Sequence, residues 1–255
     1  MRIRLLRLPI LAALGLLVLL GGTAAATPPA ARPPDPEAAG LTPSQRLGAL
    51  LERVKWEQKR LESLEAEFVQ EKESEFLTRP EISHGTFSYQ RPDRVRWEYR
   101  SPNPITLVLD GDEMVTWYRD LERAERARVG RVSTQVFRYL SASGSLDTLL
   151  GYFSVTFTAP APGEPWRLEL KPRYARIARR LSGMTLWIDR ALFLPVRVAF
   201  VEPNGDQTRY RLEGLRPNLA IPAERFELEL PAGVEVREVD LGGARGNGAG
   251  GDGPQ

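Results

Sequence analysis

Residues 90–99 read QRPDRVRWEY, and this stretch decides the class of fold. Val95, Trp97 and Tyr99 alternate with charged side chains, which is the period of a β-strand with one apolar face and one wet face. Pro92 cannot donate a hydrogen bond to a neighbouring strand, so it ends or bulges the strand before it. The stretch therefore predicts a strand that starts after a proline turn and places two large rings on one face.

The same two-residue period continues along most of the chain from Glu65 onward. Asp110-Gly111 and Asn204-Gly205 are hairpin signals between alternating runs, so neighbouring strands should be antiparallel. The further alternating apolar positions are Trp166, Leu168 and Leu170; Met184, Leu186 and Ile188; Leu194, Val196, Val198 and Phe200; and Phe226, Leu228 and Leu230. We predict one curved antiparallel sheet.

Helices are expected to cover the apolar side of this sheet. Thr42-Pro43-Ser44-Gln45 offers an N-cap, a proline at the first helical position and a capping-box glutamine. A second helical patch runs from Val132 to Leu140 and toward Leu150. The first helix has an apolar stripe formed by Leu47, Leu50, Leu51, Val54, Leu61 and Leu64. The predicted fold class is α+β, mostly antiparallel β, with a concavity that is either filled or left as an apolar cavity.

The ends of the 255-residue chain differ from its middle in composition. Residues 1–26 place three arginines before an apolar run and end in small residues, which predicts a cleavable export signal. Residues 27–40 are rich in proline and alanine and residues 240–255 in glycine, so we expect a disordered linker and a disordered tail. A single domain is expected over residues 41–239.

Charge and cysteine content exclude several function classes. The formal charge is +2, from 35 basic and 33 acidic residues, but the three signal arginines leave with the signal, giving 32 against 33 and a net −1. The basic isoelectric point is therefore no sign of nucleic-acid binding. The absence of cysteine excludes disulfides, thiolate metal sites, a cysteine nucleophile and an N-terminal lipid anchor. We expect a soluble protein that works outside the cytoplasm and has no cofactor.

Candidate catalytic groups are few. His84 is the only histidine, and its place on the polar alternation of a strand is typical of an exposed side chain. A zinc site needs more histidine or cysteine than the chain has. Asp110-Gly111-Asp112 lacks the spaced acids of a calcium loop. A basic cluster of Arg173, Arg176, Arg179 and Arg180 is read as a solvated face, with anionic headgroups or an acidic partner as the alternative. We predict that the protein is not an enzyme.

Five motifs follow one another in a specific order. They are Phe68-Val69-Gln70, Gly85-Thr86-Phe87, the run from Arg91-Pro92 to Arg96-Trp97, the run from Asp110-Gly111 to Trp117-Tyr118, and Phe226 to Val234 with its Pro231-Ala232-Gly233. This order resembles the LolA family, the periplasmic carriers of outer-membrane lipoproteins. The resemblance spans roughly residues 45–236, which is nearly all of the chain between its two biased ends.

The resemblance implies an incomplete barrel whose helices form a lid over an apolar cavity. It also implies that Arg91 holds the lid shut through hydrogen bonds. Val95 departs from the family, which often has an aromatic residue two positions before the tryptophan. The residues expected to form the cavity and lid are Arg91, Val95, Trp97, Tyr99, Leu107, Leu109, Trp117, Phe137, Leu140, Leu186 and Val198.

The implied function is a monomeric carrier of acylated lipoproteins. Its expected partners are an inner-membrane lipoprotein-releasing transporter and an outer-membrane lipoprotein acceptor. Burying acyl chains stabilises them by about 0.8 kcal/mol per methylene, so such cargo cannot cross water unaided. The alternatives are a periplasmic lipid or lipoprotein sensor, a specialised glycolipid carrier on the same fold, an enzyme that uses His84, and a structural role in the envelope.

Overall fold

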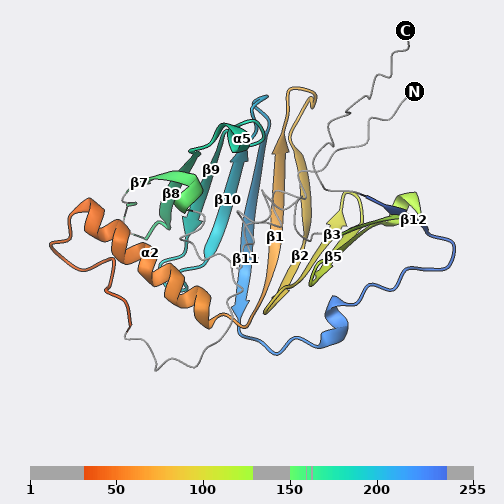
Figure 1. Cartoon of the computed structure of the whole chain (residues 1–255), viewed down its shortest axis with the longest axis horizontal. Coiled ribbons are helices and arrows are strands. Elements are labelled where there is room, and N and C mark those ends of the chain that lie inside the picture. The colour runs from red at the N-terminus through yellow and green to blue at the C-terminus, as the bar shows by residue number, and fades with distance from the viewer. Residues whose placement is uncertain (1–31, 129–149, 159, 162, 240–255) are drawn as a thin grey trace, which may run out of the picture.

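A computed structural model describes residues 32–128, 150–158, 160–161 and 163–239. One sheet dominates this part of the chain (Figure 1). Its strands are β1 (Ser63–Glu73), β2 (Glu81–Gln90), β3 (Arg94–Ser101), β4 (Ile105–Asp110), β5 (Glu113–Tyr118), β6 (Arg123–Arg128), β7 (Phe153–Thr158), β8 (Trp166–Pro172), β9 (Gly183–Ile188), β10 (Pro195–Val201), β11 (Gln207–Pro217) and β12 (Glu235–Glu238). The helical elements are α2 (Pro43–Arg60), α5 (Ala175–Ala178) and the 3-10 turns η1 (Arg119–Leu121) and η2 (Ala223–Phe226).

The strand order is β12-β6-β5-β4-β3-β2-β1-β11-β10-β9-β8-β7. Strands β1 to β6 form one antiparallel meander and strands β7 to β11 form another. The two meanders are joined by β1 and β11, which pair antiparallel from Leu64 opposite Pro217 to Glu73 opposite Gln207. Only the pairing of β12 with β6 is parallel among the described strands. The predicted fold class is confirmed.

Alternation in the sequence becomes alternation in burial, as predicted for β3, β8 and β9. Val95, Trp97 and Tyr99 are all at most 5% exposed, and the charged residues between them lie on the opposite face. In β10 the ladder has a bulge between Pro195 and Arg197, so the regular period starts only after it. The apolar faces of β1 to β11 contribute to one shared core.

Both predicted hairpins are present. Asp110 pairs with Glu113 across a two-residue turn, and Gly111 has a φ of +61°, which glycine adopts without strain. The β10–β11 connection contains Gly205 with a φ of +89°. Because the β4–β5 turn has only two residues, it fixes which side chains of the two strands share a face.

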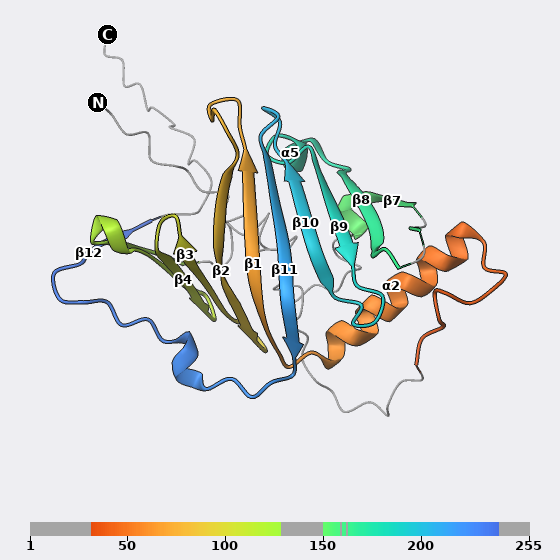
Figure 2. The same cartoon turned by 180° about the vertical axis from the view of Figure 1, so that it is seen from behind.

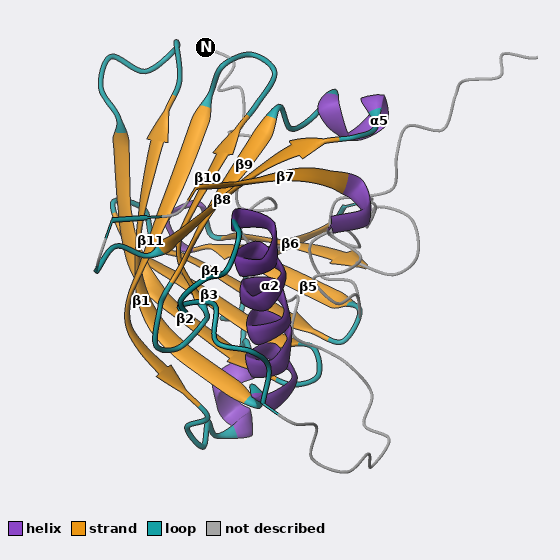
Figure 3. Cartoon of the chain, turned by 90° about the vertical axis from the view of Figure 1, so that its left-hand side faces the viewer, coloured by secondary structure: helices purple, strands orange, loops and turns teal. Residues whose placement is uncertain are grey.

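The predicted N-terminal helix is α2, and its capping box is present. The Gln45 amide donates to the Thr42 hydroxyl at 3.3 Å, and the Thr42 amide donates to the Gln45 side-chain oxygen at 3.0 Å. The helix ends at Arg60, so Leu64 belongs to β1 and not to the helical stripe. Leu50 and Val54 are buried, and α2 lies on the concave side of the curved sheet (Figure 3). From behind, the convex side shows strands in front of α2 (Figure 2).

Thr42→Ala should lower the free energy of unfolding by about 1 kcal/mol, because it removes an N-cap acceptor. Urea unfolding followed by circular dichroism measures the change. Thr42→Ser should retain most of the stability, and Thr78→Ala, at an exposed loop position, serves as the matched control. Equal stability of Thr42→Ala and Thr78→Ala would show that the cap does not stabilise α2.

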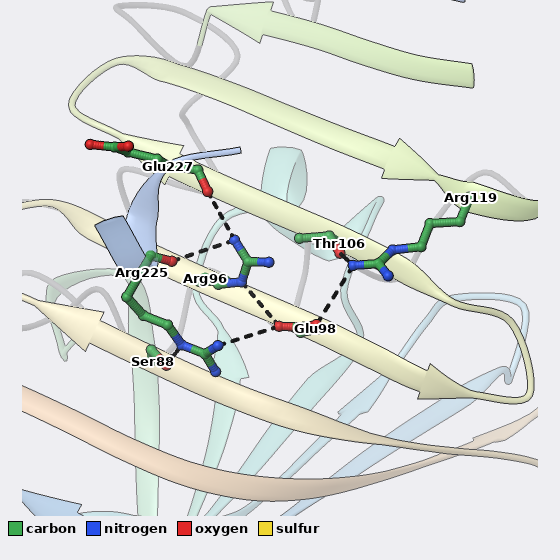
Figure 4. A network of polar contacts seen from close by, with 7 residues as sticks. All are labelled: Ser88, Arg96, Glu98, Thr106, Arg119, Arg225 and Glu227. Carbon is green, nitrogen blue, oxygen red and sulfur yellow. Dashed lines mark hydrogen bonds and ion pairs between the residues drawn. The ribbon is translucent and has the colours of Figure 1, made fainter. Parts of the chain in front are cut away.

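The expected strand at Phe226–Leu230 is wrong. Phe226 is buried and ends η2, and the residues after it are extended without pairing to a strand. The side chain of Arg96 explains the difference, because its Nη1 donates to the carbonyls of Arg225 at 3.4 Å and Glu227 at 3.1 Å (Figure 4). The Arg96 side chain on the convex face thus donates hydrogen bonds to carbonyls that would otherwise accept them from the amides of a neighbouring strand.

The same network holds the C-terminal segment on the convex face. The carboxylate of Glu98 lies 3.1 Å from Arg96 Nε, 3.6 Å from Arg225 Nη1 and 3.7 Å from Arg119 Nη2 (Figure 4). Arg225 also donates to the Ser88 hydroxyl at 3.3 Å. The segment then continues to β12, which no alternating pattern predicted because all four of its residues are exposed.

Part of the expected linker is held against the domain. The Arg46 guanidinium donates to the carbonyls of Pro36 and Ala38, and Pro36 is buried. Glu37 pairs with Arg190 of the β9–β10 connection at 2.7 Å. Residues 36–37 and 39–40 form turns, and the segment contacts both α2 and the β9–β10 connection. The expected signal, the Gly-rich tail and the helical patch at Val132–Leu140 lie outside the described residues.

Candidate functional site

A cluster of aromatic rings occupies the centre of the concave face. The Phe68 ring lies 4.7 Å from Trp97 and 4.8 Å from Tyr99, both in edge-on contact. Trp97 also packs against Phe87 at 4.8 Å and Tyr210 at 5.6 Å. These rings come from β1, β2, β3 and β11, so the cluster spans the junction of the two meanders.

Gly85 makes room for this cluster. It stands opposite Phe68 on one side and Tyr99 on the other. A Cβ atom at position 85 would lie 2.2 Å from the Glu98 carbonyl oxygen and 2.5 Å from Cζ of Phe68. The ring of Phe68 therefore occupies the space that any other residue at position 85 would fill.

The structure brings most of the predicted site residues to this face. Val95, Trp97 and Tyr99 of β3 stand beside Leu109, Leu107 and Ile105 of β4 in the register. Leu186 of β9 pairs with Val198 of β10, and both are 3% exposed. Phe137 and Leu140 lie outside the described residues. The two groups occupy the two meanders, on either side of the aromatic cluster.

Trp117 is the exception, because it lies on the opposite face. It pairs with Thr106, whereas the neighbouring Leu107 pairs with Thr116 on the concave side. Its ring is half-buried and stacks under the Arg119 guanidinium at 4.7 Å, next to the network around Glu98. The assignment of Trp117 to the cavity is corrected. The two-residue turn at Gly111 could have revealed this, because its length decides which side chains of β5 lie on the same face as those of β4.

Several concave-face residues were missed by the sequence reading. Tyr210 and Phe200 are 3% and 2% exposed and contact each other at 6.5 Å between ring centres. Met114, 6% exposed, stands opposite Leu109. Each lies in an alternating run, but which strands stand side by side could not be read from alternation alone.

Around the aromatic cluster the face is formed by uncharged side chains. The hydroxyls of Tyr99 and Tyr210 lie 3.4 Å apart, and burial raises the pKa of each above its ordinary value. Burial also raises the pKa of Tyr89, to about 12. All three phenols therefore stay protonated at neutral pH, and the face offers a ligand large apolar surfaces with few polar groups.

Helix α2 is tied to the sheet by one buried cation. Arg53 is 7% exposed, and its guanidinium lies over the rings of Phe193 at 4.7 Å and Trp56 at 5.0 Å. It also pairs with Glu57 at 2.7 Å. Cation-π contacts of this kind are stronger when they are desolvated, so Arg53 fixes the middle of α2 over the β9–β10 connection.

Arg91 is bound to the junction between α2 and β1. Its Nη2 donates to the Lys59 carbonyl in the last turn of α2 at 3.0 Å, and its Nη1 lies 3.3 Å from the Glu62 carboxylate. Its backbone amide donates to the Glu62 carbonyl at 2.8 Å. The β2–β3 turn therefore holds the C-terminal end of α2 through polar contacts, which can exchange with water without loss of packing.

The concave face is closed in this structure. Trp97, Leu107 and Leu109 are 1%, 1% and 3% exposed, and Leu186 and Val198 are equally buried. A pocket of about 150 Å³ lies at the seam where the end of α2 meets the β9–β10 connection, lined by Glu57, Arg60, Leu61, Ala191, Leu192, Leu194, Pro217 and Asn218. A ligand can reach the aromatic cluster only after the segments that cover it move.

The one histidine of the sequence lies away from the concave face. His84 is exposed, as predicted, and faces away from Phe87 and Gly85. Within residues 32–239, less the undescribed gaps, no group of three histidine, aspartate or glutamate side chains could hold a metal ion. The arrangement is that of a binding face.

Comparison with known proteins decides the family. The model of the family described as outer membrane lipoprotein carrier protein LolA matches residues 59–229. The chain belongs to the LolA family. The matched region runs from the end of α2 to the segment after η2, so it includes every strand of the two meanders and the whole aromatic cluster.

Individual relatives agree with this assignment. An outer-membrane lipoprotein carrier protein from Alkalilimnicola ehrlichii is 31% identical over 187 residues, covering 72% of this chain and 80% of the relative. One from Methylococcus capsulatus is 26% identical over 201 residues, covering 78% and 89%. A solved LolA superfamily protein from Nitrosomonas europaea covers 71% of this chain and 97% of its own, with 9% identity and a TM-score of 0.38. The LolA assignment rests on the sequence matches.

Among the described helices, none is both long enough and apolar enough to cross a bilayer.

Proposed function

We propose that this LolA-family protein carries lipoproteins through the periplasm, with their acyl chains against the concave face of the sheet. The observation that supports the proposal most directly is the buried aromatic and aliphatic face around Trp97, closed on one side by α2. The relatives named outer-membrane lipoprotein carrier proteins support the same role. Acceptance from an inner-membrane transporter and delivery to an outer-membrane acceptor complete the proposal.

The free-energy cost of exposing acyl chains to water requires such a face. One sixteen-carbon chain exposed to water costs on the order of 12 kcal/mol, at about 0.8 kcal/mol per methylene. A carrier must offset most of this cost and still release the chain to an acceptor. It does so when the closed protein also buries the same face, because cargo and lid then compete for one surface.

Opening moves α2 away from the concave face while the sheet stays intact. Opening must break the polar contacts at the two ends of the helix, through Arg91 and Glu37, and the stacking of Arg53 on Phe193 in its middle. The apolar contacts of Leu50 and Val54 are replaced by contacts of the acyl chain with the same face. The free-energy difference between the two states is therefore small, as reversible transport requires.

The two tryptophans on opposite faces provide the test. A dipalmitoylated lipopeptide with a nitroxide on its acyl chain should quench Trp97, on the concave face, much more than Trp117. Trp97→Phe should therefore remove a large share of the quenching, whereas Trp117→Phe should leave its amplitude nearly unchanged. Extraction of a labelled lipoprotein from spheroplasts by the mature protein is the second measurement.

Two results would contradict the proposal. One is equal loss of quenching in Trp97→Phe and Trp117→Phe, which would place the chain elsewhere. The other is failure to release lipoprotein from spheroplasts under conditions in which an established carrier succeeds. Circular dichroism of both variants provides the control for folding, which matters most for Trp97 because it is buried.

A further inference from the structure

The β8–β9 connection forms an exposed basic surface at one end of the sheet. Residues 171–182 contain five cations and no acid, and the sequence has no acidic residue from position 170 to position 188. We call the five cations the basic end patch; they are Lys171, Arg173, Arg176, Arg179 and Arg180, and all are exposed. The patch surrounds α5, at the top of Figure 1.

Packing beneath α5 keeps these side chains directed outward. Ile177 and Leu181 are 3% and 6% exposed and anchor the short helix to the core. The amides of Arg179 and Arg180 donate to the carbonyls of Ala175 and Ile177, both at distances of 3.0 Å or less. The backbone is therefore ordered while the guanidinium groups project into solvent.

Several arginines elsewhere on the protein surface have acidic partners. Arg216 pairs with Glu65 at 3.0 Å, Arg237 with Glu235 at 2.8 Å and Arg126 with Glu113 at 3.2 Å. In the part of the chain that the structure describes, no ion pair neutralises Lys171, Arg173, Arg179 or Arg180. These four cations of the basic end patch therefore contribute a positive field, in contrast to the paired charges of Arg216, Arg237 and Arg126.

Two aromatic side chains are exposed at the same end of the sheet. Tyr174 lies within the patch, 46% exposed, with the Arg176 guanidinium 5.5 Å from its ring centre. Phe76 is 82% exposed in the β1–β2 connection, which is at the same end because β1 and β8 both finish there (Figure 1). Four strand spacings separate the two connections, a distance of roughly 19 Å at about 4.8 Å per strand.

The part of this end from β2 to β8 is positively charged. Its three connections, residues 74–80, 171–182 and 202–206, carry six cations and three acids. The sixth cation is Arg79, and the acids are Glu75, Glu202 and Asp206. Burial and the neighbouring Asp206 raise the pKa of Glu202 above its ordinary value.

We propose that this end of the sheet docks the protein on an anionic phospholipid surface. Lysine and arginine side chains near such a surface attract its headgroups, and aromatic rings prefer the boundary between headgroups and acyl chains. A planar membrane can contact Phe76 and Tyr174 at the same time, although they are far apart on the sheet. An acidic protein would match the cations but would leave the exposed Phe76 ring without a role.

Docking at this end leaves the opposite end of the sheet free. Arg91 and the last turn of α2 are at that opposite end, since β2 finishes at Gln90 and α2 leads into the start of β1. The protein would therefore stay near a membrane while α2 moves. The proposal does not depend on the cargo, so an experiment can disprove membrane docking without disproving lipoprotein transport, and the reverse.

Flotation of the purified mature chain with vesicles tests the proposal. Vesicles of phosphatidylcholine with 30% phosphatidylglycerol should bind the protein more strongly than phosphatidylcholine alone, and salt should reduce the difference. Removing one cation should lower the partition coefficient about five-fold, so Arg179→Gln with Arg180→Gln should lower it about 25-fold. Phe76→Ser should weaken binding to both kinds of vesicle.

The matched control is Arg216→Gln with Arg237→Gln, which removes two exposed arginines far from the patch. It should bind vesicles nearly as the unchanged protein does. Equal binding to both vesicle types, or unchanged binding of the Arg179 and Arg180 variant, would overturn the proposal. So would strong binding to immobilised polyglutamate with none to vesicles, which would instead indicate an acidic protein partner.

Discussion

Arg91→Leu is expected to leave the fold intact, keep the uptake of acyl chains and slow their hand-over to an acceptor by about ten- to a hundred-fold. The substitution removes the bonds from the guanidinium to the Lys59 carbonyl and the Glu62 carboxylate. Hydrogen bonds that involve a charged group contribute about 1.5–3 kcal/mol. Their loss destabilises the closed state relative to the open one, so the lid competes less well with bound cargo.

Transfer of a labelled lipoprotein from the loaded carrier to acceptor-containing membranes measures this effect. Arg94→Leu is the matched control, because Arg94 starts the next strand and its guanidinium pairs with Asp110 at 3.2 Å, on the β4–β5 hairpin. Its transfer rate should stay close to that of the unchanged protein. Normal transfer by Arg91→Leu, or an equal loss in Arg94→Leu, would remove Arg91 from the closing mechanism.

Gly85→Ala is expected to lower the free energy of unfolding by about 3 kcal/mol, which corresponds to a fall in melting temperature of roughly 10 °C for a domain of this size. The added Cβ would lie 2.2 Å from the Glu98 carbonyl oxygen and 2.5 Å from the Phe68 ring. The carbonyl belongs to the ladder between β2 and β3, so it cannot retreat without disturbing strand pairing.

Gly183→Ala provides the control in the same sheet. A Cβ at position 183 would meet the Leu170 carbonyl at 3.6 Å, which is ordinary van der Waals contact. Its melting temperature should change by no more than a degree or two. Combining Gly85→Ala with Phe68→Leu should recover only part of the loss, because the contact with the Glu98 carbonyl remains. Similar melting temperatures for Gly85→Ala and Gly183→Ala would contradict this account.

Local signals in the sequence predicted local structure well. The capping box at Thr42 placed the start of α2, and the Asp110-Gly111 turn placed the β4–β5 hairpin, because both depend on residues a few positions apart. The segment after Phe226 could not be predicted in the same way. Its alternation resembles that of a strand, but its carbonyls accept hydrogen bonds from Arg96, which lies about 130 positions earlier in the sequence.

The sequence predicted the apolar face of each strand in the candidate site, but it did not predict which of these strands lie side by side. Alternation identified Trp97, Leu107, Leu186 and Val198 as members of apolar faces. It could not show that Phe68 and Tyr210, from opposite ends of the domain, belong to one ring cluster. That contact depends on the pairing of β1 with β11, for which the sequence contains no local signal.

The single junction between β1 and β11 also shapes how the chain reaches its native state. Within each meander every strand pairs with its sequence neighbour, so each can form through short loop closures. The junction brings Leu64 to Pro217, and its large loop-closure entropy makes it the late and slow step. Until β11 has emerged, the edge of β1 that does not pair with β2 stays free and Phe68 lacks its contact with Tyr210, so the nascent chain exposes to chaperones part of the apolar face that the native protein closes.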